Sequence, residues 1–212
     1  ALFAKQQKMS AAPVPIKDFT PVQMLKTSNF WITLFWNLLI TAGGLALISN
    51  AVPAAKEVLL KSMDASAALL LATTAMGMLS VASGVGRLII GVIWDKKGYR
   101  FTLIFVALAL TFSMMILILA SRTYNFALLV VGFFLLGFSY GGGPSSASAL
   151  TMAFFGPKYY GQNYSIITCN MIFSAIIGPT VISTMQMITG TYDSAYIVFL
   201  FFGFAALGSA LL

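Results

Sequence analysis

Arg87 is the one charged side chain in the middle of a long apolar segment of this 212-residue chain. It lies eight residues before Asp95, about 12 Å along a helix and near the middle of a hydrocarbon core roughly 30 Å thick. A guanidinium at that depth costs at least about 2.5–3.5 kcal/mol on insertion scales and therefore needs a partner. Because its planar fork binds both oxygens of a carboxylate, Arg87 predicts a carboxylate site, with backbone carbonyls and helix dipoles as the alternative partners.

The acidic residues of the chain offer Arg87 no partner at that depth. All five lie in polar stretches outside the apolar segments: Asp18, Glu57, Asp64, Asp95 and Asp193. The partner is therefore a carboxylate from a further part of the protein or an anionic substrate.

Four more side chains are candidates for the same binding site. Ser83 lies about one helical turn before Arg87 and shares its face. Tyr140 offers a hydroxyl and a ring, while Cys169 and Asn170 interrupt an apolar segment with polar atoms. For Tyr140 and Asn170, contact with substrate and hydrogen bonding between helices explain the residue equally well.

The composition excludes several classes of protein. The chain is 59% hydrophobic and 8% charged, against about 25% charged in soluble domains, and its mean hydropathy is +0.94. The net charge of +7 does not point to nucleic acid, because the basic residues are spread over separate loops. With no His and one Cys, a His/Cys metal site has no ligands, and nothing indicates a cofactor or an enzyme.

Six apolar segments are long enough to cross a bilayer as helices, which takes about 20 residues each. Their runs are apolar all round and lack the alternation of a membrane β-barrel. The sequence therefore predicts an all-α membrane protein with six transmembrane helices. The expected spans are Phe30–Val52, Ala67–Ile93, Phe101–Ala120, Phe126–Phe155, Asn163–Met187 and Ala195–Leu212.

Residues 1–29, which we call the leader, are polar and contain Lys and Pro. The leader lacks the apolar core and cleavage site of a secretory signal. Thr20 as an N-cap and Pro21 as the first helical residue predict a short interfacial helix within residues 18–25. For residues 1–16 a disordered linker is an equal alternative.

The distribution of Lys and Arg predicts the orientation, because cytoplasmic loops retain basic residues. Eight lie on the side of the leader and three on the other side, which places the leader in the cytoplasm and the chain in a plasma or inner membrane. The eight are Lys5, Lys8, Lys17, Lys26, Lys96, Lys97, Arg100 and Lys158, and the three are Lys56, Lys61 and Arg122.

The loop from Gly91 to Arg100 has the spacing G-x-x-x-D-K-x-G-x-R, formed by Gly91, Asp95, Lys96, Gly98 and Arg100. Gly91 would allow close approach of helices, and Gly98 a tight turn. Asp95 would accept from helix amides or from a cation across a cytoplasmic gate. The spacing resembles a signature of the major facilitator superfamily, in which two six-helix halves form a twelve-helix transporter. A basic turn set by topology alone is the alternative.

The segment around Gly141, Gly142 and Pro144 contains three glycines and a proline within an otherwise apolar span. This composition predicts a hinge or a broken turn that swings a gate.

Six short motifs follow one another from Lys17 onward: Lys17-Asp18-Phe19, Met24-Leu25-Lys26-Thr27, Asn29-Phe30-Trp31, Ser83-Gly84-Val85-Gly86-Arg87, Phe138-Ser139-Tyr140-Gly141-Gly142 and Gly161-Gln162-Asn163-Tyr164. In these motifs, their order and their spacing the chain resembles the oxalate:formate antiporter family and its monocarboxylate-transporter relatives. The resemblance implies that this chain is the C-terminal half, helices seven to twelve with the last one truncated, and that the leader is the cytoplasmic loop between the halves. It also implies that Arg87 is the substrate-binding arginine and Tyr140 an aromatic substrate contact.

Two departures from the family refine the expected substrate. Oxalate carriers have a Lys where this chain has Met171, so a single cation would face the substrate, and Met171 would add an apolar contact. Animal-type monocarboxylate transporters have an Asp where this chain has Ser83. If transport is coupled to protons, the titrating group must come from the other half or be the substrate itself.

These observations predict alternating access that carries a monocarboxylate of the lactate and pyruvate class together with a proton. The alternatives are an oxalate:formate-type anion exchanger and a non-transporting receptor of the same fold. The expected partners are a small carboxylate, a proton, the lipid bilayer and an N-terminal six-helix half, with no nucleic acid.

Overall fold

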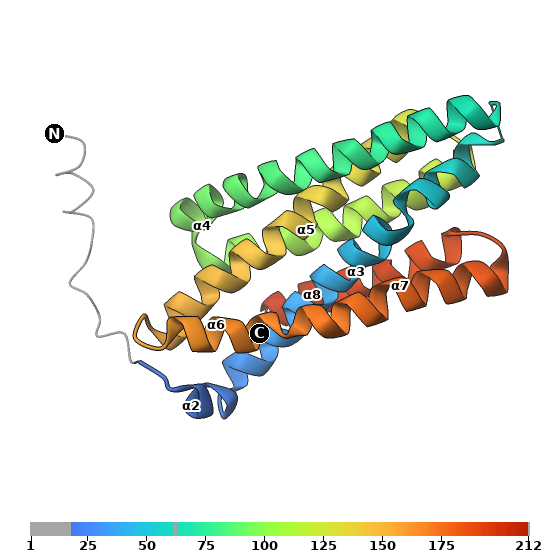
Figure 1. Cartoon of the computed structure of the whole chain (residues 1–212). Coiled ribbons are helices and arrows are strands. Elements are labelled where there is room, and N and C mark those ends of the chain that lie inside the picture. Colours follow the sequence, from blue (N-terminus) through green and yellow to red (C-terminus); the bar gives the residue numbers. More distant parts are fainter. Residues whose placement is uncertain (1–17, 62, 212) are drawn as a thin grey trace, which may run out of the picture.

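The computed structural model describes residues 18–61 and 63–211, and the expectations for residues 1–16 lie outside this part of the chain. All of its regular secondary structure is helical (Figure 1). The helices are α2 (Pro21–Leu25), α3 (Ser28–Leu59), α4 (Ala65–Thr123), α5 (Phe126–Phe155), α6 (Tyr160–Thr168), α7 (Asn170–Thr189) and α8 (Asp193–Leu211).

Two of the six expected spans lie within α4. The helix reverses at Gly98, whose φ of 80° and ψ of 177° are not helical, so the chain crosses the bundle once before this residue and once after it. Five helical stretches are long and apolar enough to cross a membrane, and one of them is this 59-residue α4. The prediction of six crossings is therefore confirmed.

The fifth expected span consists of α6 and α7, which meet at Cys169. The backbone N–H of Cys169 lies 3.2 Å from the carbonyl oxygens of both Ser165 and Ile166, so the helix narrows locally before it continues. We did not anticipate this interruption.

The short helix α2 forms as the Thr20-Pro21 pair predicts. Gln23 N–H lies 3.4 Å from Thr20 Oγ1, and Thr20 N–H donates to Gln23 Oε1 at 3.0 Å, which makes a capping box. Phe19 fixes the segment to the bundle, because its N–H donates to Phe155 O at 3.0 Å and its ring meets the Phe155 ring edge-on.

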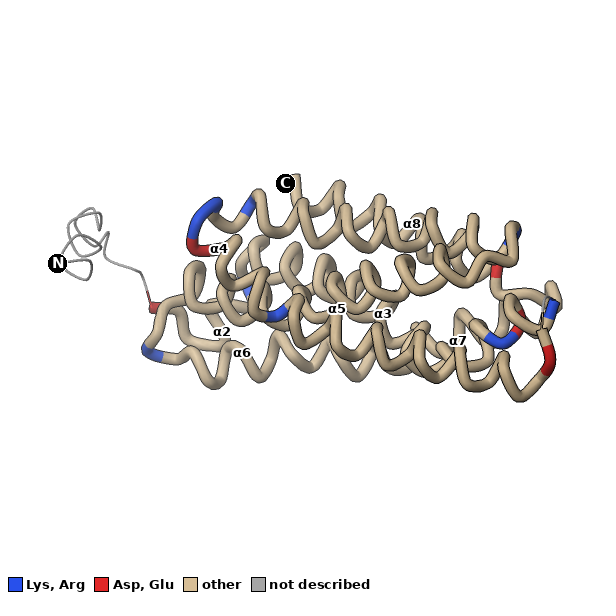
Figure 2. Tube along the Cα trace, turned by 90° about the horizontal axis from the view of Figure 1, so that it is seen from above, with Lys and Arg blue, Asp and Glu red and all other residues tan. Residues whose placement is uncertain are grey.

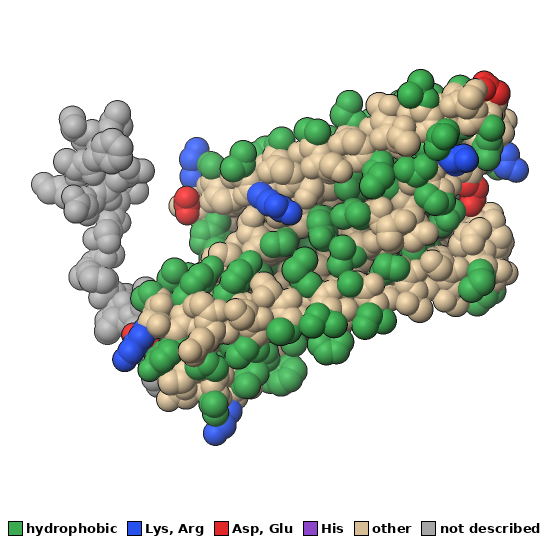
Figure 3. Space-filling view, viewed as in Figure 1, with side chains coloured by type: hydrophobic (Ala, Val, Ile, Leu, Met, Phe, Trp, Pro, Cys, Tyr) green, Lys and Arg blue, Asp and Glu red, His purple; other side chains and the backbone are tan. Residues whose placement is uncertain are grey.

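The loops alternate between two ends of the bundle, where the charged residues gather (Figure 2). At the end that carries α2, Lys158 N–H donates to Asp18 at 3.1 Å, and the Tyr99 ring meets Phe154 with 5.3 Å between centroids. The opposite end holds residues 60–61, 63–64, 123–125 and 190–192. Between the ends, hydrophobic side chains cover much of the outer surface (Figure 3), as expected for helices that contact lipid.

The glycine-rich segment of α5 corrects one expectation. It is not a broken turn, because α5 is helical throughout Phe126–Phe155 with Pro144 inside. Its glycines instead admit neighbouring helices: a Cβ on Gly141 would overlap the carbonyl oxygen of Ser83, and one on Gly142 would lie 2.8 Å from Val106. Small residues that let helix backbones approach are the usual means of packing in membranes, where the hydrophobic effect between helices is absent.

Candidate functional site

The orientation of Arg87 follows from the close crossing of α4 and α5. Gly86 faces α5, where a Cβ would lie 2.6 Å from Phe138 O, and Ser83 is buried in the same crossing beside Gly141. Successive helical residues are rotated by about 100°, so the residue after Gly86 points away from this contact. Arg87 accordingly lies on an exposed face of the bundle.

Arg87 has no ionic partner among the residues that the structure describes. The one ion pair in that part of the chain joins Arg122 to Asp193 at the far end of the bundle, with 3.8 Å between Nε and Oδ2.

Two tyrosine hydroxyls lie within the electrostatic reach of Arg87. One belongs to Tyr140 on α5 and the other to Tyr164 on α6. The structure thus brings together two residues singled out from the sequence, Arg87 and Tyr140, and adds Tyr164, which we had noted only as part of a motif. The arrangement offers one permanent cation and two neutral hydrogen-bond donors to an anion.

Both tyrosines are held by neighbours. The Tyr140 ring lies against the backbone of Gly44 on α3, where any Cβ would overlap it. The Tyr164 ring stacks on Tyr160 with 5.6 Å between centroids and 5° between planes, and Tyr160 OH lies 2.8 Å from Ser148 Oγ. Tyr164 could have been found in the sequence from its spacing of four residues after Tyr160, which places both rings on one helical face.

Asn170 is buried and does not lie on the exposed face that carries Arg87. The residue is 1% exposed, and neither amide atom has a hydrogen-bond partner among the described residues. One turn later on α7, Ser174 Oγ lies 2.6 Å from Thr41 Oγ1 of α3, so Asn170 faces the interior between these two helices. Of the two roles expected for Asn170, the described residues show neither: its amide makes no hydrogen bond between helices, and the buried side chain is not on the exposed face of Arg87.

The residues on either side of Asn170 are more open. Cys169 is exposed, and its thiol contacts the Ser165 carbonyl at 3.3 Å. Met171 is half-buried.

The loop with the spacing G-x-x-x-D-K-x-G-x-R has the turn that was predicted at Gly98, but its other expected contacts are absent within the described residues. No described heavy atom of a neighbouring helix lies within 4 Å of a Cβ built on Gly91, so none of the helices α2 to α8 packs against it there. Asp95 and Lys96 are exposed, and neither forms a hydrogen bond or ion pair there. The side of α4 that carries Gly91 is therefore free to meet another surface.

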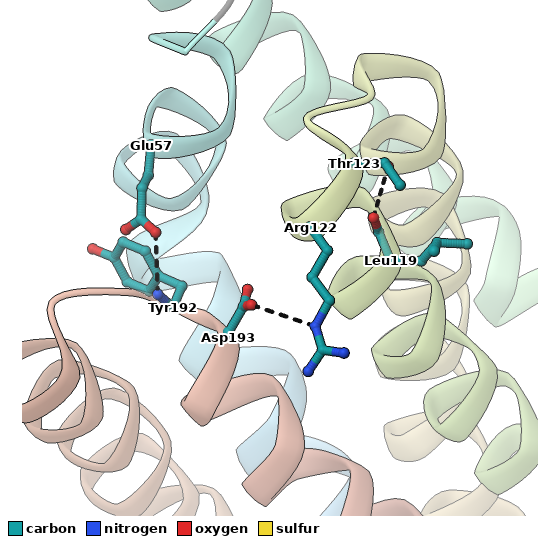
Figure 4. Close-up of polar contacts among 6 residues, drawn as sticks. All are labelled: Glu57, Leu119, Arg122, Thr123, Tyr192 and Asp193. Atoms are coloured by element: carbon teal, nitrogen blue, oxygen red, sulfur yellow. Dashed lines mark hydrogen bonds and ion pairs between the residues drawn. The ribbon is translucent and has the colours of Figure 1, made fainter.

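At the opposite end, polar contacts join α3, α4 and α8 (Figure 4). Tyr192 N–H donates to Glu57 at 3.4 Å, and Arg122 pairs with Asp193. Burial raises the pKa of Tyr192, and the nearby Glu57 carboxylate raises it further. These contacts brace the helix ends and lie far along the chain from Arg87. No cluster of three metal-ligating side chains occurs in residues 18–61 and 63–211.

Comparison with known proteins shows the family of the chain. The family model of the Major Facilitator Superfamily matches residues 3–179 and 64–212. The chain is 30% identical over 167 residues to the oxalate:formate antiporter of Oxalobacter formigenes. That alignment covers 76% of this chain and 37% of the relative, so the chain spans well under half the length of that protein.

Proposed function

Because this chain belongs to the Major Facilitator Superfamily, we propose that it forms one six-helix half of a secondary active transporter for small carboxylates. The family consists of transporters rather than enzymes, in keeping with a multi-pass helical bundle. The other six helices would come from a preceding half, and the exposed side of α4 that carries Gly91 and Asp95 is open to such a partner.

The observation that carries the proposal is Arg87 itself, which lies on an exposed face and has no ionic partner among the described residues, while its charge acts on the Tyr140 and Tyr164 hydroxyls. A carboxylate would bind both guanidinium N–H edges of Arg87 and accept from the tyrosines. Bound substrate then neutralises a charge that is costly in the membrane, which lowers the barrier to reorientation of the two halves. Ser83 and Cys169 stay secondary candidates for contact with the substrate.

The substrate we favour is a monocarboxylate of the lactate, pyruvate or formate kind, carried with a proton. One arginine matches one carboxylate, and Met171 adds an apolar surface where oxalate carriers have a second cation. A second candidate is the exchange of oxalate for formate, supported by the name of the Oxalobacter relative. A receptor that binds but does not transport is the third.

We further propose that the leader lies in the cytoplasm and that the protein lies in the plasma or inner membrane. The eight basic residues on the leader side against three on the other side support this orientation.

Uptake into proteoliposomes tests these proposals. The full-length protein is reconstituted, and radiolabelled lactate, formate and oxalate are offered with and without a pH gradient and with and without internal anion. Uptake of lactate or formate that increases with external acidity supports proton-coupled transport. Uptake of oxalate that requires internal formate supports exchange instead, and binding without flux of any of the three supports the receptor.

A further inference from the structure

A pocket of about 230 Å³ lies at the end of the bundle that carries α2, separate from Arg87. Residues from α3, α5, α8 and the part of α4 after Gly98 line it. The size is below the roughly 300–1,000 Å³ of pockets for drug-sized ligands, so it suits a small group.

The polar lining of this pocket consists mainly of hydrogen-bond donors and one cation. Arg100 is the one charged residue in the lining, and it forms no ion pair with the described residues; its neighbour is the Tyr99 ring, with 6.0 Å from Cζ to the centroid. Trp36 is 1% exposed, and its indole Nε1–H has no acceptor in the part of the chain that the structure describes. An indole N–H only donates, and leaving it unpaired is costly.

Two further side chains in the lining have unused hydrogen-bonding capacity. The Asn29 amide and the Thr33 hydroxyl make no side-chain hydrogen bond within residues 18–61 and 63–211. No carboxylate lines the pocket. A cation with hydrogen-bond donors and no acid in the same described lining is the chemistry that binds an oxyanion.

The position of the pocket relative to the membrane surface indicates which oxyanion it binds. Asn29 directly precedes the first apolar segment, and Arg100 directly precedes the third, so both lie where the membrane core meets water. Phosphate groups of lipids are concentrated at this level, and basic pockets between transmembrane helices bind them.

We propose that this pocket, which we call the Arg100 pocket, binds a phosphate group, supplied by an anionic phospholipid headgroup or by free phosphate. The guanidinium of Arg100 holds two phosphate oxygens, and Asn29 and Thr33 supply further donors. Binding would join the starts of α3 and of the second half of α4, two segments that meet at this end.

Thermal unfolding of the purified full-length protein tests the assignment. Inorganic phosphate is titrated in one series, and phosphatidylglycerol in detergent micelles in a second, with phosphatidylcholine as the reference lipid. Saturable stabilisation by phosphatidylglycerol alone assigns the headgroup, and saturable stabilisation by inorganic phosphate assigns the free ion. Absence of stabilisation in both series overturns the proposal.

Substitutions in the lining test whether this stabilisation arises from binding in the Arg100 pocket. Arg100→Gln and the nearly isosteric Thr33→Val each weaken the apparent affinity, Arg100→Gln by about tenfold or more. Lys97→Gln is the matched control, because Lys97 is an exposed cation of the same loop that does not line the pocket. If Lys97→Gln weakens binding as much as Arg100→Gln, the attraction is general electrostatics and the Arg100 pocket is not the site. Thr33→Val changes no charge and leaves Arg100 in place. Weaker binding by this variant therefore reports on the pocket and not on misfolding around a substituted Arg100.

Discussion

The aromatic ring of Tyr140 lies directly on the backbone of Gly44, so α3 determines where this candidate substrate contact points. Only a residue without a side chain leaves the ring in place. The site on α4, α5 and α6 is therefore positioned in part by a helix that contributes no charge to it.

Gly44→Ala should displace the Tyr140 ring and weaken substrate affinity by about tenfold, since small displacements of binding groups have large effects. The measurement is ligand titration of the full-length protein by thermal unfolding. Gly43→Ala is the adjacent control: a Cβ there meets Leu110 at 3.2 Å and does not touch Tyr140. Equal effects of the two substitutions would show that Gly44 acts through general packing.

Gly137→Ala should lower the free energy of unfolding by about 1–3 kcal/mol, the usual cost of overpacking. The added methyl group would overlap the carbonyl oxygen of Leu79 on α4, and backbone moves less easily than a side chain. Gly84→Ala serves as the comparison, because nothing lies within 4 Å of a Cβ at that position and alanine favours the helix. Denaturant unfolding in micelles measures both, and a stable Gly137→Ala protein would contradict the close crossing.

The hydrogen bond between Thr41 and Ser174 should contribute roughly 0.6–1.7 kcal/mol to the contact of α3 with α7, the range found for such bonds in membranes. A double-mutant cycle of Thr41→Val and Ser174→Ala gives this coupling energy. Thr73→Val is the control, because the Thr73 hydroxyl donates only to carbonyls of its own helix, at 3.0 and 2.8 Å. Additive effects of the two changes would mean that the hydroxyls do not interact.

Met171→Lys should shift preference from monocarboxylates toward oxalate, because a second cation would face the second carboxylate. Competition between labelled formate and unlabelled oxalate in uptake assays measures the preference. Met171→Leu, which keeps the apolar contact and adds no charge, should leave the preference unchanged. An unaltered preference in Met171→Lys would place residue 171 away from the substrate.

The sequence predicted the elements more fully than the contacts between them. The lengths of the apolar segments alone predicted six crossings, and α5 has the predicted bounds Phe126–Phe155. The Thr20-Pro21 pair predicted α2, and Gly98 the reversal within α4. These features depend on local chemistry, such as a cap or a positive φ.

The contacts depend on which side of each helix faces its neighbours, and helices that are apolar all round carry little information about this. For that reason the role of Gly141 in close packing and the burial of Asn170 emerged only from the structure. Arg87 itself was identifiable, because a charge in an apolar segment needs a partner whatever its neighbours are.

The most direct test of the account is thermal unfolding of the full-length protein and its Arg87→Ala variant, each titrated with lactate, pyruvate, formate, acetate, oxalate and succinate at two pH values. We predict that a monocarboxylate stabilises the unmodified protein, more strongly at the lower pH. Arg87→Ala should lose this stabilisation while its unliganded melting temperature stays the same or rises, since an unpaired charge has been removed. Stabilisation of the Arg87→Ala protein by the same carboxylate at the same concentrations would contradict the assignment of Arg87 as the anion-binding residue.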